Sequence, residues 1–173
     1  MLPEKLVDVY RGDLVESSHY GHVVISNNLG EILAFWGNPE TLIYPRSSCK
    51  IIQALPLLET GSAKQFSLGP KHLALACASH SGGEIHLNVA KDWLQKIELD
   101  EQDLLCGCHL PYDKTQTKKL KKNEENPSQL HNNCSGKHLS FLTISKTIVH
   151  KNNYKSNYID INHPVQKIVK KTF

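Results

Sequence analysis

The period of the apolar pattern changes near residue 40, and this change constrains the fold more than any other feature. Residues 6–37 favour strands: two apolar segments, GHVVIS at 21–26 and EILAFWG at 31–37, are joined by the Gly/Asn turn signal NNLG. This arrangement predicts an antiparallel hairpin. Asn38, Pro39 and Pro45 then interrupt the chain, and helical patterns follow. The expected fold class is α/β, of the α+β kind.

Helices are predicted from residue 46 onward. Apolar residues at 51, 52, 55 and 58 indicate one helix face over about 48–60, with Pro56 inside the helix and Gly61 at its end. Further helices are predicted over the apolar part of 69–77, over about 84–99, over the polar stretch 114–126, after the turn at 131–135, and from Pro164 onward. No repeat or linker divides the chain, so we expect a single domain over 1–173, with the hairpin in about 6–37 and a helical region in about 46–173.

Charge and composition exclude several classes of function. The net charge of +3 is too small to indicate nucleic-acid binding, and the lysine-rich stretch 114–126 has no interleaved aromatics. No apolar run approaches the roughly 18 residues of a membrane span, and the start lacks the apolar core of a signal peptide. We therefore expect a cytoplasmic protein without a membrane partner. The five cysteines favour free thiols over a disulfide framework.

The segment PRSSCK contains an S-x-x-K pair, Ser47 and Lys50. On the first turn of a helix these residues share one face, so the lysine amine can reach the serine hydroxyl and act as its base. Ser48 lies off that face, and Cys49 is interpreted as a small buried group. Taken alone, the pattern is common by chance, and Ser47 as a helix cap with Lys50 as a surface residue is the more frequent arrangement.

Two other stretches contain unusual residues. ASHSGG at 78–83 can supply a hydroxyl and backbone N–H groups to an active site, or can simply end one helix and begin the next. HNNCSGKH at 131–138, with CGCH upstream at 106–109, contains cysteines and histidines that suit zinc. Their spacings, however, match no standard zinc finger.

Five motifs in this order resemble the L-asparaginase II family, the rhizobial serine-dependent type. They are YPRSSCKIIQALPLLETGSA, LACASHSGG, CGCHLPYD, NPSQLHNNCSGKH and HPVQ, and the resemblance runs from about residue 6 to residue 173. It implies a fold similar to the serine β-lactamases and penicillin-binding proteins, an αβα sandwich with a helical subdomain. It also implies hydrolysis of the small molecule L-asparagine to L-aspartate and ammonia.

The resemblance assigns roles to individual residues. Ser47, Lys50 and Ser79 match catalytic residues, and either serine is a candidate nucleophile activated by Lys50. Arg46, His80 and Gly82 are assigned to substrate binding. Cys134 and Lys137 match two zinc ligands, and we expect His138 in the shell around them. The implied chemistry is acyl transfer, with backbone N–H groups near the serines stabilising the oxyanion.

The resemblance also implies that family members are about twice this length, with a second zinc cysteine and a further lysine beyond residue 173. Three explanations are open: a piece of a longer protein, the product of a decaying gene, or a homodimer whose partner covers the exposed sheet. The alternative function is a catalytically inactive chain acting as a binding or oligomerisation module. A third reading, amidase or peptidase activity of the penicillin-binding type, is weaker because no K-T-G-like motif is present.

Overall fold

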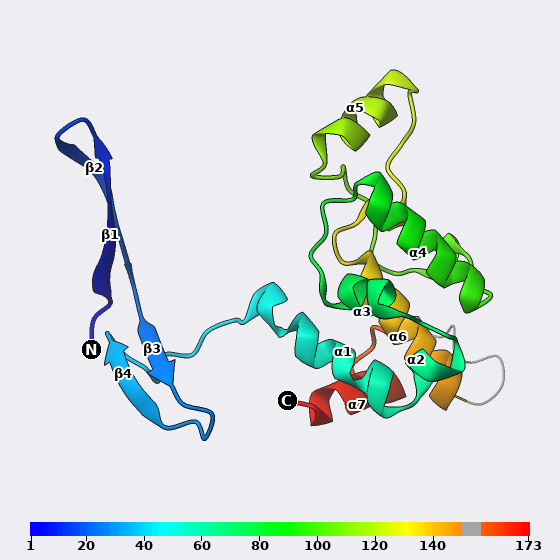
Figure 1. The fold of residues 1–173 in the computed structure, drawn as a ribbon, viewed down its shortest axis with the longest axis horizontal. Helices are drawn as coiled ribbons and strands as arrows, with labels where there is room; N and C mark the ends of the chain where they lie inside the picture. The colour runs from blue at the N-terminus through cyan, green and yellow to red at the C-terminus, as the bar shows by residue number, and fades with distance from the viewer. Residues whose placement is uncertain (150–156) are drawn as a thin grey trace. The chain divides into compact units, whose positions relative to one another are not determined.

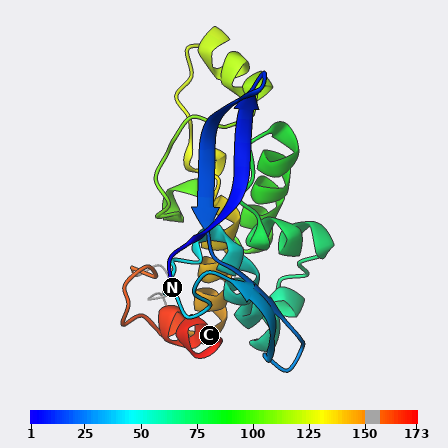
Figure 2. The same ribbon diagram turned by 90° about the vertical axis from the view of Figure 1, so that its left-hand side faces the viewer.

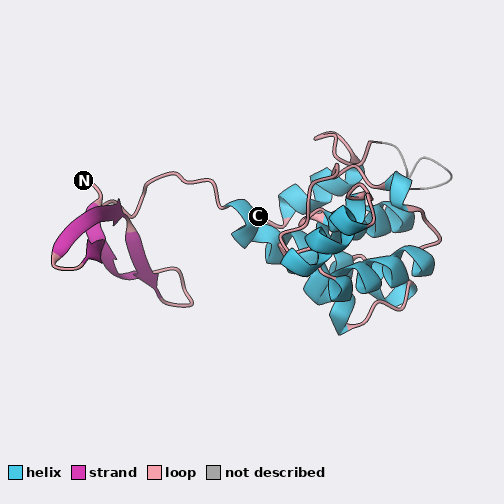
Figure 3. Ribbon diagram, turned by 90° about the horizontal axis from the view of Figure 1, so that it is seen from above, coloured by secondary structure: helices cyan, strands magenta, loops and turns pink. Residues whose placement is uncertain are grey.

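The computed structural model describes residues 1–149 and 157–173. The chain forms two compact units, Met1–Tyr44 and Pro45–Phe173. Strands occur in the first unit and helices in the second (Figures 1 and 3). The structure is therefore a mixture of helix and strand, as expected. The boundary at Pro45 falls where the sequence pattern changes. The prediction of a single domain stays a prediction.

The first unit consists of two antiparallel hairpins. Strands β1 (Glu4–Arg11) and β2 (Leu14–Gly21) pair with each other and run side by side (Figure 2). Strands β3 (Val23–Ser26) and β4 (Ile32–Trp36) form the second pair, which confirms the predicted hairpin. The Asn27 side chain fixes its turn, because Oδ1 accepts hydrogen bonds from the Leu29 and Glu31 N–H groups at 2.9 and 3.0 Å.

The first unit has no hydrophobic core of its own. Every residue of Met1–Tyr44 is described, and Gly37 alone among them is buried. Apolar side chains such as Leu14 (77% exposed) and Leu33 (65%) face solvent. Two-stranded sheets are at best marginally stable in water without a packed face. The hairpins therefore present apolar surface that nothing within their own unit covers.

The second unit is helical, and every predicted helix is present. The main helices are α1 (Lys50–Glu59), α2 (Ser62–Gln65), α3 (Pro70–Cys77), α4 (Glu84–Lys96), α5 (Lys114–Lys122), α6 (Ser135–Ile148) and α7 (Pro164–Lys171). Short 3₁₀ turns are η1 (Arg46–Cys49), η2 (Glu101–Asp103) and η3 (Gln129–His131). Gly61 ends α1 with a φ of 75°, in the left-handed region that favours glycine. Pro70 occupies the first turn of α3, where its missing N–H costs nothing.

Helix α6 is the centre of the second unit. It packs against α1, α2, α3, α4 and α7, and its side chains are buried continuously from Leu139 to Ser145. Its first turn approaches α3 very closely at Gly136. A Cβ at this position would lie 2.1 Å from the Leu75 carbonyl oxygen, so only glycine fits. This contact brings the HNNCSGKH segment against the helix that leads to ASHSGG.

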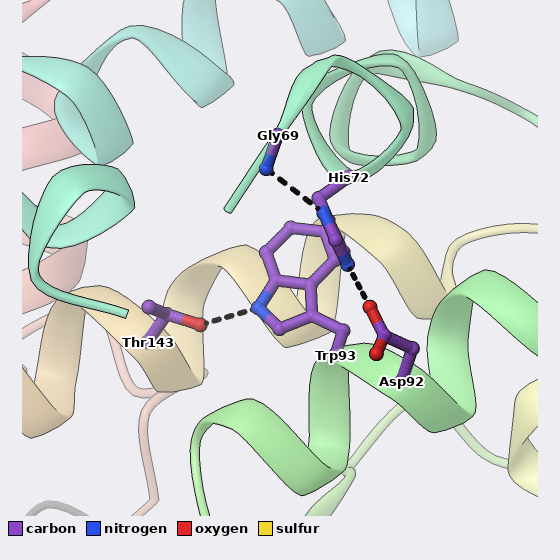
Figure 4. Close-up of polar contacts among 5 residues, drawn as sticks. All are labelled: Gly69, His72, Asp92, Trp93 and Thr143. Atoms are coloured by element: carbon purple, nitrogen blue, oxygen red, sulfur yellow. Dashed lines mark hydrogen bonds and ion pairs between the residues drawn. The ribbon is translucent and has the colours of Figure 1, made fainter. Parts of the chain in front are cut away.

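A polar cluster joins α3, α4 and α6 (Figure 4). His72 Nδ1 accepts a hydrogen bond from the Gly69 N–H at 3.0 Å, which leaves Nε2–H to donate to Asp92 Oδ2 at 2.8 Å. The fully buried Trp93 donates from Nε1 to Thr143 Oγ1 at 2.9 Å. These bonds satisfy the His72 ring and the Trp93 indole N–H and help to fix the relative positions of the three helices.

The buried face of α1 differs from the prediction. Ile51, Leu55 and Leu58, three of the four residues taken as its apolar face, are exposed at 62%, 40% and 52%. The buried positions include Lys50 and Leu57 instead. The pattern correctly predicted the helix, but the packing of α6 and α3 selected a different face. In the ranges 1–149 and 157–173, no helix combines the length and apolarity needed to cross a membrane.

Candidate active site

Lys50 is the residue around which the three unusual sequence stretches meet. It begins α1 and is only 3% exposed. Its Nζ donates to the Ala78 carbonyl at 2.7 Å, to Ser79 Oγ at 2.8 Å and to the Asn133 carbonyl at 3.4 Å. Three N–H donors thus meet three oxygen acceptors. Ser79 and Asn133, which lie 29 and 83 positions after Lys50 in the sequence, therefore both contact its amine.

Ser47 lies on the 3₁₀ turn η1, not on the first turn of α1. Its side chain is exposed, and among the described residues Lys50 bonds to Ser79 and not to Ser47. It caps neither η1 nor α1, whose N-cap residues are Pro45 and Cys49. The S-x-x-K pair is therefore present, but in this structure the serine facing the lysine is Ser79.

The neighbours of Ser47 bond to the local backbone. Ser48 Oγ donates to the Pro45 carbonyl at 2.5 Å, and Cys49 Sγ donates to the Arg46 carbonyl at 2.9 Å. Cys49 is half-buried rather than buried. Arg46 is exposed and has a φ of 53°, unusual for a residue with a side chain. A substrate-binding role for Arg46 stays a prediction.

His80 supports the loop that carries Ser79. Its Nδ1 accepts from the Gly82 N–H at 3.1 Å, so Nε2–H donates to Ser135 Oγ at 2.8 Å. Burial, helped by the nearby His86 and Lys50, lowers the pKa of His80 to about 4 and keeps the ring neutral. Both ring nitrogens are thus bonded within the protein. His80 is placed to hold the loop, and its role toward substrate stays a prediction.

Gly82 allows this loop to approach two other segments. Its φ is 74°, and a Cβ would lie 2.8 Å from both the His131 carbonyl oxygen and Pro111 Cβ. Nearby, the Asp113 N–H donates to the Ser81 carbonyl at 2.8 Å. The CGCHLPYD and HNNCSGKH motifs therefore meet ASHSGG through backbone contacts, which explains why all three occur together in the sequence. Contact of Gly82 with substrate stays a prediction.

Asparagines fix the segment before α6. The Asn133 N–H donates to His109 Nε2 at 3.1 Å, while the Asn133 carbonyl accepts from Lys50. The Asn132 amide donates to the Cys106 carbonyl at 2.8 Å and accepts from the Cys134 N–H at 2.8 Å. Sequence reasoning missed the roles of Ala78 and Asn133, because a backbone carbonyl leaves no trace in residue type. It also missed the role of His109, whose ring nitrogen accepts from the Asn133 backbone.

Cys134 and Lys137, the predicted zinc ligands, are three residues apart at the start of α6 and both are half-buried. Neighbouring positions on one helix face suit a shared ligand. A zinc site needs at least three protein donors, whereas Cys134 and Lys137 supply only two. Over the described part of the chain, no three His, Cys, Asp or Glu side chains gather to hold a metal. Burial also raises the pKa of Cys106 to about 12, so this thiol is protonated in the absence of a metal. The residues present do not complete a zinc site.

His138 is buried beside this pair. The Tyr158 hydroxyl accepts from the Leu105 N–H at 2.7 Å and therefore donates to His138 Nδ1 at 2.9 Å. Burial, with a smaller effect of Lys137 and Lys50, lowers the pKa of His138 to about 4. Tyr158 was not predicted, although it anchors the histidine from a position 20 residues later. A role of His138 around a metal stays a prediction.

The lowered pKa of His80 makes stability depend on pH. The unfolded ring titrates near 6.5, so below this pH the unfolded state binds a proton that the folded state takes up only near pH 4. We expect the free energy of unfolding to fall from pH about 6.5 to about 4, by about 2 kcal/mol from His80. Urea unfolding across this range should show a shallower fall in His80→Gln than in the wild type. The matched control is His19→Gln, at an exposed histidine. If the unfolding free energy of His80→Gln fell with pH as steeply as that of the wild type, His80 would not be the source of the pH dependence.

Comparison with known protein families gave a match over most of the chain. The profile of the L-asparaginase II family matches residues 7–173, nearly the whole chain. A comparison with curated proteins gave no match. The matched range includes the Lys50–Ser79 contact and all five motifs. The chain therefore belongs to the L-asparaginase II family.

Proposed function

We propose that this chain is an L-asparaginase, which hydrolyses the side-chain amide of L-asparagine to L-aspartate and ammonia. Family membership supports an asparaginase-like function acting on a small molecule. One observation carries the proposal: a lysine that is 3% exposed donates to a serine hydroxyl at 2.8 Å. A buried amine at hydrogen-bonding distance from a serine is the arrangement that nucleophilic acyl transfer needs. The proposed setting is the cytoplasm, with neither nucleic acid nor membrane as a partner.

The proposed reaction has two acyl-transfer steps. A serine Oγ attacks the amide carbon of asparagine while Lys50, having lost one proton, keeps two N–H groups for the Ala78 and Asn133 carbonyls and takes the hydroxyl proton on its lone pair. The C–N bond then breaks, and the proton returns from Lys50 to the leaving nitrogen, which departs as ammonia. Water attacks the aspartyl ester, again with Lys50 as base, and frees aspartate and the serine. Substrate contacts are proposed for Arg46, His80 and Gly82.

The geometry favours Ser79 as the serine that Lys50 activates. We expect Ser79→Ala to lower kcat for ammonia release by about a thousandfold, because it removes the hydroxyl bonded to the base. Ser47→Ala should lower kcat by about tenfold or less, because among the described residues Lys50 bonds to Ser79 and not to Ser47. Steady-state ammonia release with both variants checks this, and Ser48→Ala is the neighbouring control. A larger loss in Ser47→Ala than in Ser79→Ala would move the nucleophile to Ser47.

Zinc and the overall fold belong to the same proposal but rest on the resemblance. Cys134 and Lys137 are the proposed ligands contributed by this chain, and they are too few to define a site. We assign no reaction step to zinc. The proposed fold is the αβα sandwich of the serine β-lactamases, with α1 to α7 as its helical part.

The exposed hairpins favour a second candidate function, an inactive chain that serves as a binding or oligomerisation module. Apolar side chains of all four strands face solvent, and the apolar face of α1 is exposed as well. Large exposed apolar patches mark interaction sites. The molecular mass in solution separates the two: a homodimer without ammonia release supports the module, and ammonia release removes it as the sole function.

A further inference from the structure

A groove lies between α3 and α4, beside the Lys50 site. Its main cavity has a volume of about 460 Å³, within the range of small-molecule sites. Ala74 of α3 and Ala78, the residue just after α3, line one wall, and these small side chains leave the groove open. The groove adjoins the Lys50 site through Ala78, whose carbonyl accepts from Lys50. None of Ser47, Lys50 and Ser79 lines it.

Opposite charges occur at one end of this groove. A smaller hollow of about 220 Å³ continues the cavity, because both are lined by Lys71, Asn88 and Val89. This hollow also contains Asp92. The His72 ring bonds to Oδ2 of that carboxylate (Figure 4). No described residue bonds to Oδ1. An ammonium donor, an amide and a carboxylate acceptor therefore surround one small space.

The other end of the groove is apolar and contains one unexplained polar atom. Leu75, Ala78, Ile85 and Val89 supply the walls. His86 also lines the cavity, and its Nδ1 is buried without a hydrogen-bond partner among the described residues. The walls at this end therefore suit an apolar side chain.

We propose that this groove binds a free α-amino acid with an aliphatic or aromatic side chain. The α-carboxylate pairs with Lys71 and the α-ammonium with Asp92, while the side chain lies along Ala74, Ala78 and Val89. A zwitterion matches the two opposite charges, and a simple acid or amine matches only one of them. The site is separate from the proposed asparagine site and does not depend on it.

L-Leucine is the probe that tests this proposal. Titration followed by calorimetry should show saturable binding with a dissociation constant around 1 mM. 4-Methylpentanoate lacks the ammonium group and 3-methylbutylamine lacks the carboxylate. Each should bind about three- to fivefold more weakly, because the lost ion pair is solvent-exposed. Lys71→Met and Asp92→Asn should weaken L-leucine binding by similar factors.

Three variants make the test specific. Ala74→Leu fills the groove on an exposed helix position that leucine tolerates, and it should reduce binding at least about tenfold. Lys96→Met, an exposed lysine at the end of α4, should bind L-leucine like the wild type. Lys91→Met, at another exposed lysine of α4 that lines neither hollow, should also bind it unchanged. The proposal is overturned by no saturation at about 10 mM L-leucine, by unaltered binding in Ala74→Leu, by binding of the two analogues as tight as that of L-leucine, or by loss of binding in Lys91→Met.

Discussion

Lys50→Met is expected to lower ammonia release from L-asparagine by about a thousandfold. Methionine has a similar length and no proton to exchange, so the variant removes the base and keeps the buried volume. The amine it removes meets Ser79 Oγ at 2.8 Å and two carbonyl oxygens. The measurement is kcat from steady-state ammonia release, with circular dichroism to confirm that the variant is folded.

Lys96→Met is the matched control for this experiment. Lys96 is exposed in the last turn of α4, and its replacement should leave kcat within about twofold of the wild type. A folded Lys50→Met variant that retains full ammonia release would remove Lys50 from the reaction. Such a result would also leave the Lys50–Ser79 bond as a purely structural contact.

Gly136→Ala is expected to destabilise the second unit by about 3 kcal/mol or more. The added Cβ would lie 2.1 Å from the Leu75 carbonyl oxygen and 2.6 Å from its carbon, and neither backbone atom can move without shifting α3 against α6. Because α3 leads to Ser79, we also expect activity to fall in whatever fraction remains folded. Urea unfolding measures the free energy.

Gly69→Ala provides the comparison, since a Cβ at Gly69 meets no atom within 4 Å and its φ is −93°. It should cost only about 1 kcal/mol, the typical loss on placing alanine at a helix N-cap. Equal losses in the two variants would mean that the close approach of α6 to α3 contributes nothing specific.

Sequence patterns predicted which elements form more reliably than they predicted which faces those elements bury. The turn signal NNLG and the apolar segments beside it specify the β3–β4 hairpin locally. The buried face of α1 depends on the helices that pack against it. Because α1 has apolar residues on several sides, its sequence alone does not reveal which side those helices bury. Ile51 and Leu58 therefore looked like core residues and are exposed.

In the candidate site, too, the sequence predicted the local motifs but not the contacts between them. Spacing paired Lys50 with Ser47, three residues away, but η1 is a 3₁₀ turn and the lysine points toward the end of α3. The pairing with Ser79 arises from tertiary packing, which Gly82 and Gly136 permit by close backbone approach. The order of the motifs revealed that these segments belong together, although no single motif specified their contacts.

Whether this chain is an L-asparaginase is tested most simply by ammonia release from L-asparagine, with the purified, unsubstituted chain. We expect saturable release of ammonia and aspartate in equal amounts, from chain shown to be folded by circular dichroism. A folded chain that releases no ammonia from L-asparagine would contradict it.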